Sequence, residues 1–135
     1  MKKFPFYKQA DSKDCGPTCL KIIAKHYKKP IPIQLLRSLS ETTRSGSSLL
    51  GISNAAEKLG FRSLGVKITL DQLQEEVPLP CILHWNKNHY VVLYKISRGV
   101  FYISDPAHGI LKYSKEELLK FWIGNNATET TEEGI

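Results

Sequence analysis

Cysteine is scarce in this chain, which excludes several classes of small protein. Three cysteines occur among 135 residues. An odd number without paired spacing does not make a disulfide framework, and it favours a reducing compartment. Cys15 and Cys19 have the spacing C-x-x-x-C instead of the redox spacing C-x-x-C, and no second cysteine pair could complete a zinc site. A thiol redox protein or a zinc protein is therefore a poor alternative.

Long apolar runs are also absent. The longest extend over a few residues, so the sequence predicts no membrane-spanning segment. The N-terminal residues 1–5 lack the apolar stretch of a signal peptide. Neither a phosphate-binding loop, nor metal-ligand spacing, nor an internal repeat is present. We therefore expect no cofactor and no resident metal.

Acidic residues are fewer than basic ones, and the formal net charge is +6. Such a charge could suit nucleic acid or an anionic membrane surface. The lysines and arginines are scattered along the chain and form no continuous stripe. This distribution is typical of a solvated surface, so nucleic acid is not an expected partner.

The first sixty residues have the pattern of helices. A length of 135 residues is sufficient for one domain with a real core. Amphipathic helices are predicted at 15–28, 33–39 and 48–59. In the first of them, one face carries the apolar residues Leu20, Ile23, Ala24 and Tyr27.

From Phe61 onward the pattern is typical of strands. Short runs rich in β-branched and aromatic residues occur at 64–68, 81–85, 90–96, 100–104 and 110–113. Capping boxes that begin at Thr69 and Ser114 predict two short helices among them. A helical N-terminal half packed on a C-terminal antiparallel sheet is an α+β fold. We expect the domain to cover 1–126, with a polar, disordered tail or linker at 127–135.

Cys15 is the candidate nucleophile because it begins a predicted helix. Unpaired backbone N–H groups and the positive end of the helix dipole favour an anion at this position, and a thiolate is the reactive form of cysteine. Pro17 supports the helix start, since proline suits its first turn. On position alone, burial as an ordinary core cysteine remains the commoner alternative. We expect Cys19 and Cys81 to be core residues.

The strand half supplies a histidine and a carboxylate. If Ser97, Arg98 and Gly99 form a hairpin loop, His89 and Asp105 become diagonal neighbours on one face of the sheet. A two-residue loop would shift the register by one and send Asp105 to the opposite face. A cysteine nucleophile needs an imidazole that a carboxylate orients, so this pairing predicts a cysteine peptidase.

Three other histidines compete with His89. His26 lies in the last turn of its helix, where a surface role fits the helix dipole. His84 is the stronger competitor because it precedes Trp85 in a neighbouring strand. His108 follows Asp105 in a predicted turn. We expect a structural role for all three.

Taken in order, these residues match a known family. Gln9, the stretch 14–20, His84-Trp85, the stretch 88–93 and Asp105-Pro106 with Gly109 resemble the papain-like peptidase domain of bacteriocin-exporting ABC transporters. The resemblance covers nearly the whole chain and implies a papain-like fold. It implies Cys15 as nucleophile, His89 as general base and acid, Asp105 as the residue that orients His89, and Gln9 as the oxyanion-hole donor. A side-chain amide ahead of the nucleophile is suited to that last role.

The same resemblance implies a substrate and partners. Domains of this family cleave leader peptides after a double-glycine motif on the cytoplasmic side of the membrane. The implied partners are the leader peptide and the transmembrane and nucleotide-binding domains of a transporter, which this chain lacks. No ATP binding is expected in this segment. We expect the leader to bind as an amphipathic helix on an apolar patch, and the alternative is a domain that binds cargo without cutting it.

Overall fold

The computed structural model describes residues 3–43, 46–85 and 89–132, and its helices lie where the sequence predicts them. The first sixty residues form α1 (Cys15–His26), α2 (Ile33–Leu39) and α3 (Leu49–Lys58), and a 3₁₀ turn at Ser12–Asp14 precedes α1. The hydroxyl of Ser48 caps α3 by accepting the N–H of Gly51. The two predicted capping boxes are confirmed at the starts of α4 (Leu70–Glu75) and α5 (Lys115–Phe121).

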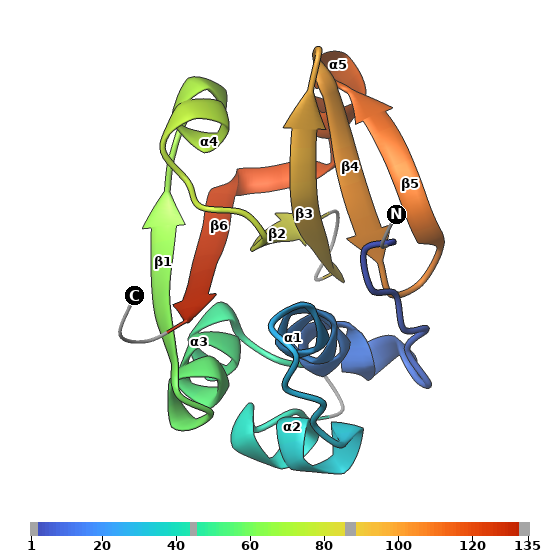
Figure 1. Cartoon of the computed structure of the whole chain (residues 1–135), viewed down its shortest axis with the longest axis vertical. Helices are drawn as coiled ribbons and strands as arrows, with labels where there is room; N and C mark the ends of the chain where they lie inside the picture. Colours follow the sequence, from blue (N-terminus) through green and yellow to red (C-terminus); the bar gives the residue numbers. More distant parts are fainter. Residues whose placement is uncertain (1–2, 44–45, 86–88, 133–135) are drawn as a thin grey trace.

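In the part of the chain that the structure describes, six strands form one antiparallel sheet in the order β1-β6-β2-β3-β4-β5 (Figure 1). They are β1 (Phe61–Lys67), β2 (Cys81–Trp85), β3 (His89–Ser97), β4 (Val100–Asp105), β5 (Gly109–Ser114) and β6 (Trp122–Glu132). Helices first and an antiparallel sheet second confirm the predicted α+β class. Within the described ranges, no helix is long and apolar enough to cross a membrane.

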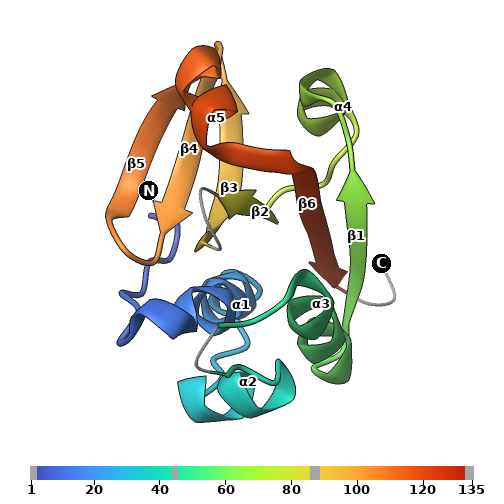
Figure 2. The same ribbon diagram turned by 180° about the vertical axis from the view of Figure 1, so that it is seen from behind.

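The tail is ordered further than the sequence predicts. Residues 127–132 continue β6, which pairs with β1 on one side and with β2 on the other (Figure 2). The expectation of disorder is therefore wrong for these residues, and the last residues of the predicted tail, 133–135, lie outside the described part. Backbone hydrogen bonds to two neighbours hold such a strand, and threonine has a high strand propensity, so no apolar period is needed.

Two cores lie on the two faces of the sheet. The first joins α1, α2 and α3 to the sheet, with Leu20, Ile23 and Ile52 packed against Ile82 and Val92. The second joins α4 and α5 to the other face, and its members include Leu73, Leu83, Val91, Phe101 and Leu118. Strands β2 and β3 are thus buried on both sides. This position fixes their residues firmly relative to α1.

The β3–β4 hairpin has the predicted pairing near Asp105, but its loop differs from the predicted one. The loop has two residues, Arg98 and Gly99, so Ser97 pairs with Val100, and the three-residue loop expected from the sequence is wrong. Both loop residues have positive φ, 52° and 76°, as a turn that matches the twist of a hairpin requires.

A β-bulge then restores the register. The partner of Leu93 is Ile103, whereas the partner of Lys95 is Tyr102, so β3 contains one extra residue, Tyr94, between these pairs. The bulge offsets the shorter loop by one residue. Beyond it Val92 pairs with Ser104, and Asp105 stays on the face of His89.

Candidate active site

Cys15 is the first residue of α1 and is almost completely buried, with 2% of its surface exposed. The residue after it is packed tightly against α3: a Cβ on Gly16 would lie 2.9 Å from Cδ1 of Ile52. A side chain at this position would push against Ile52, so glycine favours the close approach of the two helices. Cys19 and Cys81 are fully buried, as predicted, and burial raises the pKa of Cys19 well above its ordinary value.

His89 and Asp105 are in direct contact. Nε2 of His89 lies 2.6 Å from Oδ1 of Asp105, so the predicted proximity of these two residues is confirmed. Asp105 is 1% exposed and also accepts the N–H of Ala107 at 2.9 Å. Burial alone would raise the pKa of Asp105, but its hydrogen bonds to His89 and Ala107 and the charge of His89 hold that pKa below its usual value.

His89 connects this carboxylate to the thiol. Its imidazole hydrogen-bonds with both Asp105 and Cys15. Since Nε2 contacts Asp105, Nδ1 is the nitrogen left for the thiol. Burial alone would lower the pKa of His89, but the two hydrogen bonds and the charges of Asp105 and Cys15 raise it to about 9. The imidazolium form is therefore the main form at neutral pH.

Gln9 lies on an extended segment that is tied to β4 and the turn after it. The backbone N–H of Gln9 donates to the carbonyl of Pro106 at 2.9 Å. Farther back, the hydroxyl of Ser104 donates to the carbonyl of Pro5 at 3.0 Å. Ser104 and Pro106, the residues on both sides of Asp105, thus hold the segment that carries Gln9. Asp105 itself contacts His89, so this part of the chain positions both Gln9 and His89. The Gln9 side chain donates from Nε2 to the carbonyl of Asp11 at 3.1 Å.

The three competing histidines have different environments. His84 faces Tyr90 across β2 and β3, with its ring stacked on the tyrosine at 5.1 Å. Burial lowers the pKa of His84, and neither of its ring nitrogens has a hydrogen-bond partner among the described residues. His26 packs against Phe4 at the far end of α1. Only His108 reaches the site, where its Nδ1 lies 3.1 Å from Oδ2 of Asp105.

Two contacts of the site are not predicted by the sequence analysis. His108 was expected only to be a turn residue, although its position three residues after Asp105 in a tight turn could have indicated the contact. The second contact is a bidentate ion pair: Arg37 in α2 donates to both oxygens of Asp14 at 2.9 and 2.7 Å. Asp14 is fully buried and immediately precedes Cys15, so this pair ties the start of α1 to α2. Asn88, part of the sequence motif, lies outside the described residues.

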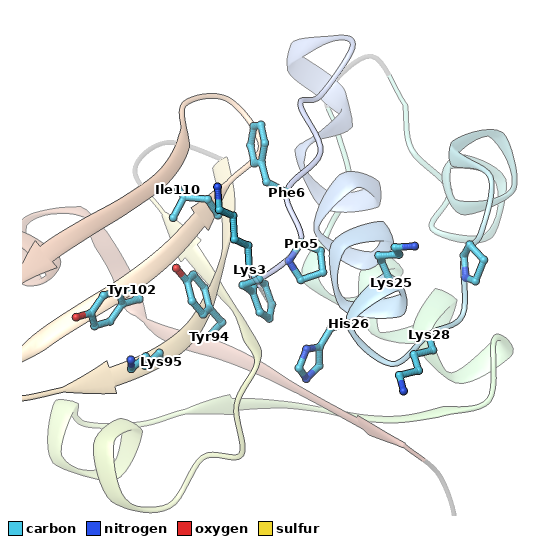
Figure 3. Close-up of a pocket in the computed structure, with 12 residues that line it drawn as sticks. Lys3, Pro5, Phe6, Lys25, His26, Lys28, Tyr94, Lys95, Tyr102 and Ile110 are labelled. Atoms are coloured by element: carbon cyan, nitrogen blue, oxygen red, sulfur yellow. The ribbon is translucent and has the colours of Figure 1, made fainter. Parts of the chain in front are cut away.

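A cavity of about 1240 Å³ lies at the opposite end of α1 (Figure 3). Its walls come from the N-terminal segment 3–6, the end of α1, and strands β3, β4 and β5. Aromatic rings line it, including Tyr94 and Tyr102, and the ring of Phe4 stacks on Tyr94 at 4.2 Å. Four lysines surround these rings: Lys3, Lys25, Lys28 and Lys95. The cavity therefore suits a ligand that is both apolar and acidic.

Curated proteins with similar sequences are much longer than this chain. It is 42% identical over 129 residues to the lactococcin-G-processing and transport ATP-binding protein LagD of Lactococcus lactis subsp. lactis, covering 92% of this chain and 18% of LagD. It is 35% identical over 123 residues to the colicin V secretion/processing ATP-binding protein CvaB of Escherichia coli, covering 91% of this chain and 18% of CvaB. The chain thus spans less than a fifth of the length of these relatives.

Solved structures match the entire fold. The peptidase domain of Streptococcus ComA, a bifunctional ABC transporter involved in a quorum-sensing pathway, superposes with a TM-score of 0.91 at 32% identity, covering 97% of this chain and 100% of that domain. A double-glycine-motif protease from an AMS/PCAT transporter, in complex with its leader peptide, also has a TM-score of 0.91 and 32% identity, covering 96% of this chain and 92% of that one.

The family model of the peptidase C39 family matches residues 3–133, nearly the whole chain. The match includes the helix that begins at Cys15 and both strands that carry His89 and Asp105. The fold is that of papain-like peptidase domains in this family. The chain therefore belongs to the peptidase C39 family and is a cysteine peptidase.

Proposed function

We propose that this domain removes leader peptides after a double-glycine motif and acts together with an ABC exporter on the cytoplasmic side of the bacterial membrane. The observation that carries the proposal is the contact of Cys15, His89 and Asp105 at the start of α1. The relatives support the substrate and the partner, since their names combine processing with transport. A solved relative is a double-glycine-motif protease with a bound leader peptide.

Cys15 is the proposed nucleophile and His89 the proposed general base and acid. Nδ1 of His89 holds the Cys15 proton in a thiolate–imidazolium pair, and the thiolate attacks the carbonyl carbon of the scissile bond. The same nitrogen then gives that proton to the leaving amine, and an acyl-enzyme remains on Cys15. Water hydrolyses this thioester, with His89 as base. Asp105 orients the imidazole and stabilises its charge throughout.

Gln9 is the proposed oxyanion-hole donor, together with the backbone N–H of Cys15. Its anchored segment supports this role, because the hydrogen bond to Pro106 ties Gln9 to the turn that follows Asp105. A donor held in advance costs little reorganisation when charge develops in the transition state. The side-chain amide has two N–H groups, and substrate binding would redirect one of them from Asp11 toward the oxyanion.

Burial of Cys15 favours glycine on the acyl side of the scissile bond. A thiol with 2% exposure is reached most easily by a backbone without side chains. A steric clash with a larger residue discriminates more strongly than a missing methylene would. Two glycines, however, offer little surface for binding. The affinity must come from residues farther upstream in the leader.

We propose the aromatic and lysine-lined cavity as the site of those upstream residues. Cys15 and His26 are the two ends of the twelve-residue α1, which is about 18 Å long. A helical leader of similar length could extend from the glycines along α1 to the cavity. There, apolar residues at i, i+3, i+4 and i+7 would contact Tyr94 and Tyr102, and acidic residues would approach the lysines.

The main function is tested with one peptide that carries a leader ending in Gly-Gly, followed by a short cargo. Mass spectrometry should detect a single cut after the second glycine. Leucine in place of that glycine should lower kcat/KM by about a hundredfold or more, because its side chain clashes near Cys15. Binding without any cut would instead support the alternative of a cargo-binding domain. Equal cleavage of the leucine peptide would contradict the proposed specificity.

The leader site is tested separately with Tyr94→Ala and Lys95→Glu. Each should raise KM for the leader-bearing peptide about tenfold and leave kcat nearly unchanged, since the changes are remote from the reacting atoms. A short Gly-Gly peptide without the helical leader serves as the control substrate and should respond to neither change. Lys58→Glu is the matched charge reversal on α3. If it raised KM as strongly as Lys95→Glu, the lysines would act only through net charge.

A further inference from the structure

His108 creates a cluster that the peptidase reaction does not require. Its Nδ1 lies 3.1 Å from Oδ2 of Asp105, whose other oxygen contacts Nε2 of His89. The three possible ligand atoms, one from each residue, all lie within 4.8 Å of one another. One carboxylate oxygen and two imidazole nitrogens thus converge on a small volume at the back of the catalytic histidine.

We propose that His89, Asp105 and His108 form an inhibitory binding site for Zn²⁺. Two imidazoles and one carboxylate are a donor set that zinc accepts, with the fourth position left to water. Hard cations such as Mg²⁺ prefer oxygen ligands and fit this set poorly.

The local backbone supports the proposed site. The turn after β4 is closed by the N–H of His108, which donates to the Asp105 carbonyl at 3.1 Å, and by the N–H of Ala107, which donates to Oδ1 of Asp105 at 2.9 Å. This turn holds two of the three ligands next to each other. The His108 side chain is 68% exposed, so an ion can enter from that side although Asp105 is buried.

Zinc would rearrange the three side chains, whose ligand atoms lie within 4.8 Å of one another. Ligand atoms of a tetrahedral zinc ion are about 3.3 Å apart, as follows from bond lengths of about 2 Å. The contact of His89 with Asp105, at 2.6 Å, would open, and the contact of His108, at 3.1 Å, is already close to that value. Because His108 is exposed, its ring can move toward the ion with little loss of packing.

Zinc at this site would block the proton transfers that follow the attack of Cys15. A neutral imidazole has one nitrogen lone pair and one N–H. If the lone pair of Nε2 binds zinc, the single proton of His89 lies on Nδ1, and giving it up would leave an imidazolate. His89 then can neither protonate the leaving amine nor accept a proton from the hydrolytic water.

The binding test uses the Cys15→Ala protein, which removes the competing possibility of zinc on the thiol. Calorimetry should still detect one Zn²⁺ bound to this variant, and Co²⁺ should give the visible absorption of a tetrahedral site without a thiolate band. Adding His108→Ala should weaken Zn²⁺ binding by about tenfold or more, because a ligand is lost. His26→Ala, which removes an exposed histidine elsewhere, should leave binding unchanged.

The inhibition test compares each protein with its own metal-free rate. Zn²⁺ should inhibit the unmodified domain, Mg²⁺ should not, and His108→Ala should raise the Zn²⁺ concentration for half inhibition about tenfold or more. Loss of zinc binding in Cys15→Ala, with inhibition undiminished in His108→Ala, would overturn the proposal in favour of a site on the thiol. Since calorimetry needs no cleavage, the result does not depend on the substrate proposed above.

Discussion

Replacing Cys15 by alanine should abolish peptide cleavage, with a loss in kcat on the order of 10⁴-fold or more. Without the thiol no acyl-enzyme can form, and no other cysteine is placed to substitute. The side chain is small and the helix start is held by the Asp14–Arg37 ion pair, so the fold should remain intact. Cleavage is measured with a leader-bearing peptide, and folding by circular dichroism.

Cys19→Ala is the matched control for this change. Cys19 is fully buried one turn farther along α1, and its raised pKa keeps it a protonated thiol. We expect this variant to retain most of the activity. Alkylation near neutral pH should likewise modify Cys15 first. If Cys19 or Cys81 reacted first while Cys15 was spared, Cys15 would not be the nucleophile.

His89→Ala should have the second-largest effect and lower kcat by about 10³- to 10⁴-fold. The variant loses both the acceptor of the thiol proton and the donor to the leaving amine. KM should change much less, since the imidazole acts on proton transfer more than on binding. Steady-state kinetics with the leader-bearing peptide measures both constants.

Two variants serve as controls for the His89→Ala prediction. His84→Ala removes a histidine that stacks on Tyr90, so it should act on packing or KM and leave most of kcat. The reverse pattern, a large loss of kcat in His84→Ala and a small one in His89→Ala, would contradict the assignment. Asp105→Asn should cost less kcat than His89→Ala, because it mis-orients the base without removing it.

The pH profile separates the orienting role of Asp105 from simple packing. The raised pKa of His89 means that the imidazolium is retained up to about pH 9 and lost above it, so kcat/KM should fall on the alkaline side near that value. In Asp105→Asn the carboxylate charge is gone, and the alkaline fall should begin at lower pH.

Local patterns in the sequence are sufficient to predict the helices and the position of Cys15 at a helix start. Helix α1 begins at Cys15 and buries Leu20, Ile23 and Ala24, as the apolar spacing predicts. Both capping boxes form as well. These features depend on side chains and backbone groups within a few residues of one another, so the sequence alone is enough to predict them.

Pairing between distant segments was harder to predict. The proximity of His89 to Asp105 was expected from a three-residue loop, but it results from a two-residue loop together with a bulge at Tyr94. Either change alone would have turned Asp105 to the other face. The order of residues 127–132 was missed for a similar reason, because backbone pairing with β1 throughout, and with β2 at 127–129, stabilises them.

The sequence by itself determined the α+β order, the helix start at Cys15 and the set of residues that could form a cysteine peptidase. Only the tertiary structure decided which groups meet around them: the Gln9 segment on Pro106, Arg37 on Asp14, and His108 on Asp105. The physical reason is the range of the interactions. Helix caps and apolar periods act within one or two turns, whereas each contact at the site depends on how separate elements pack around the two cores.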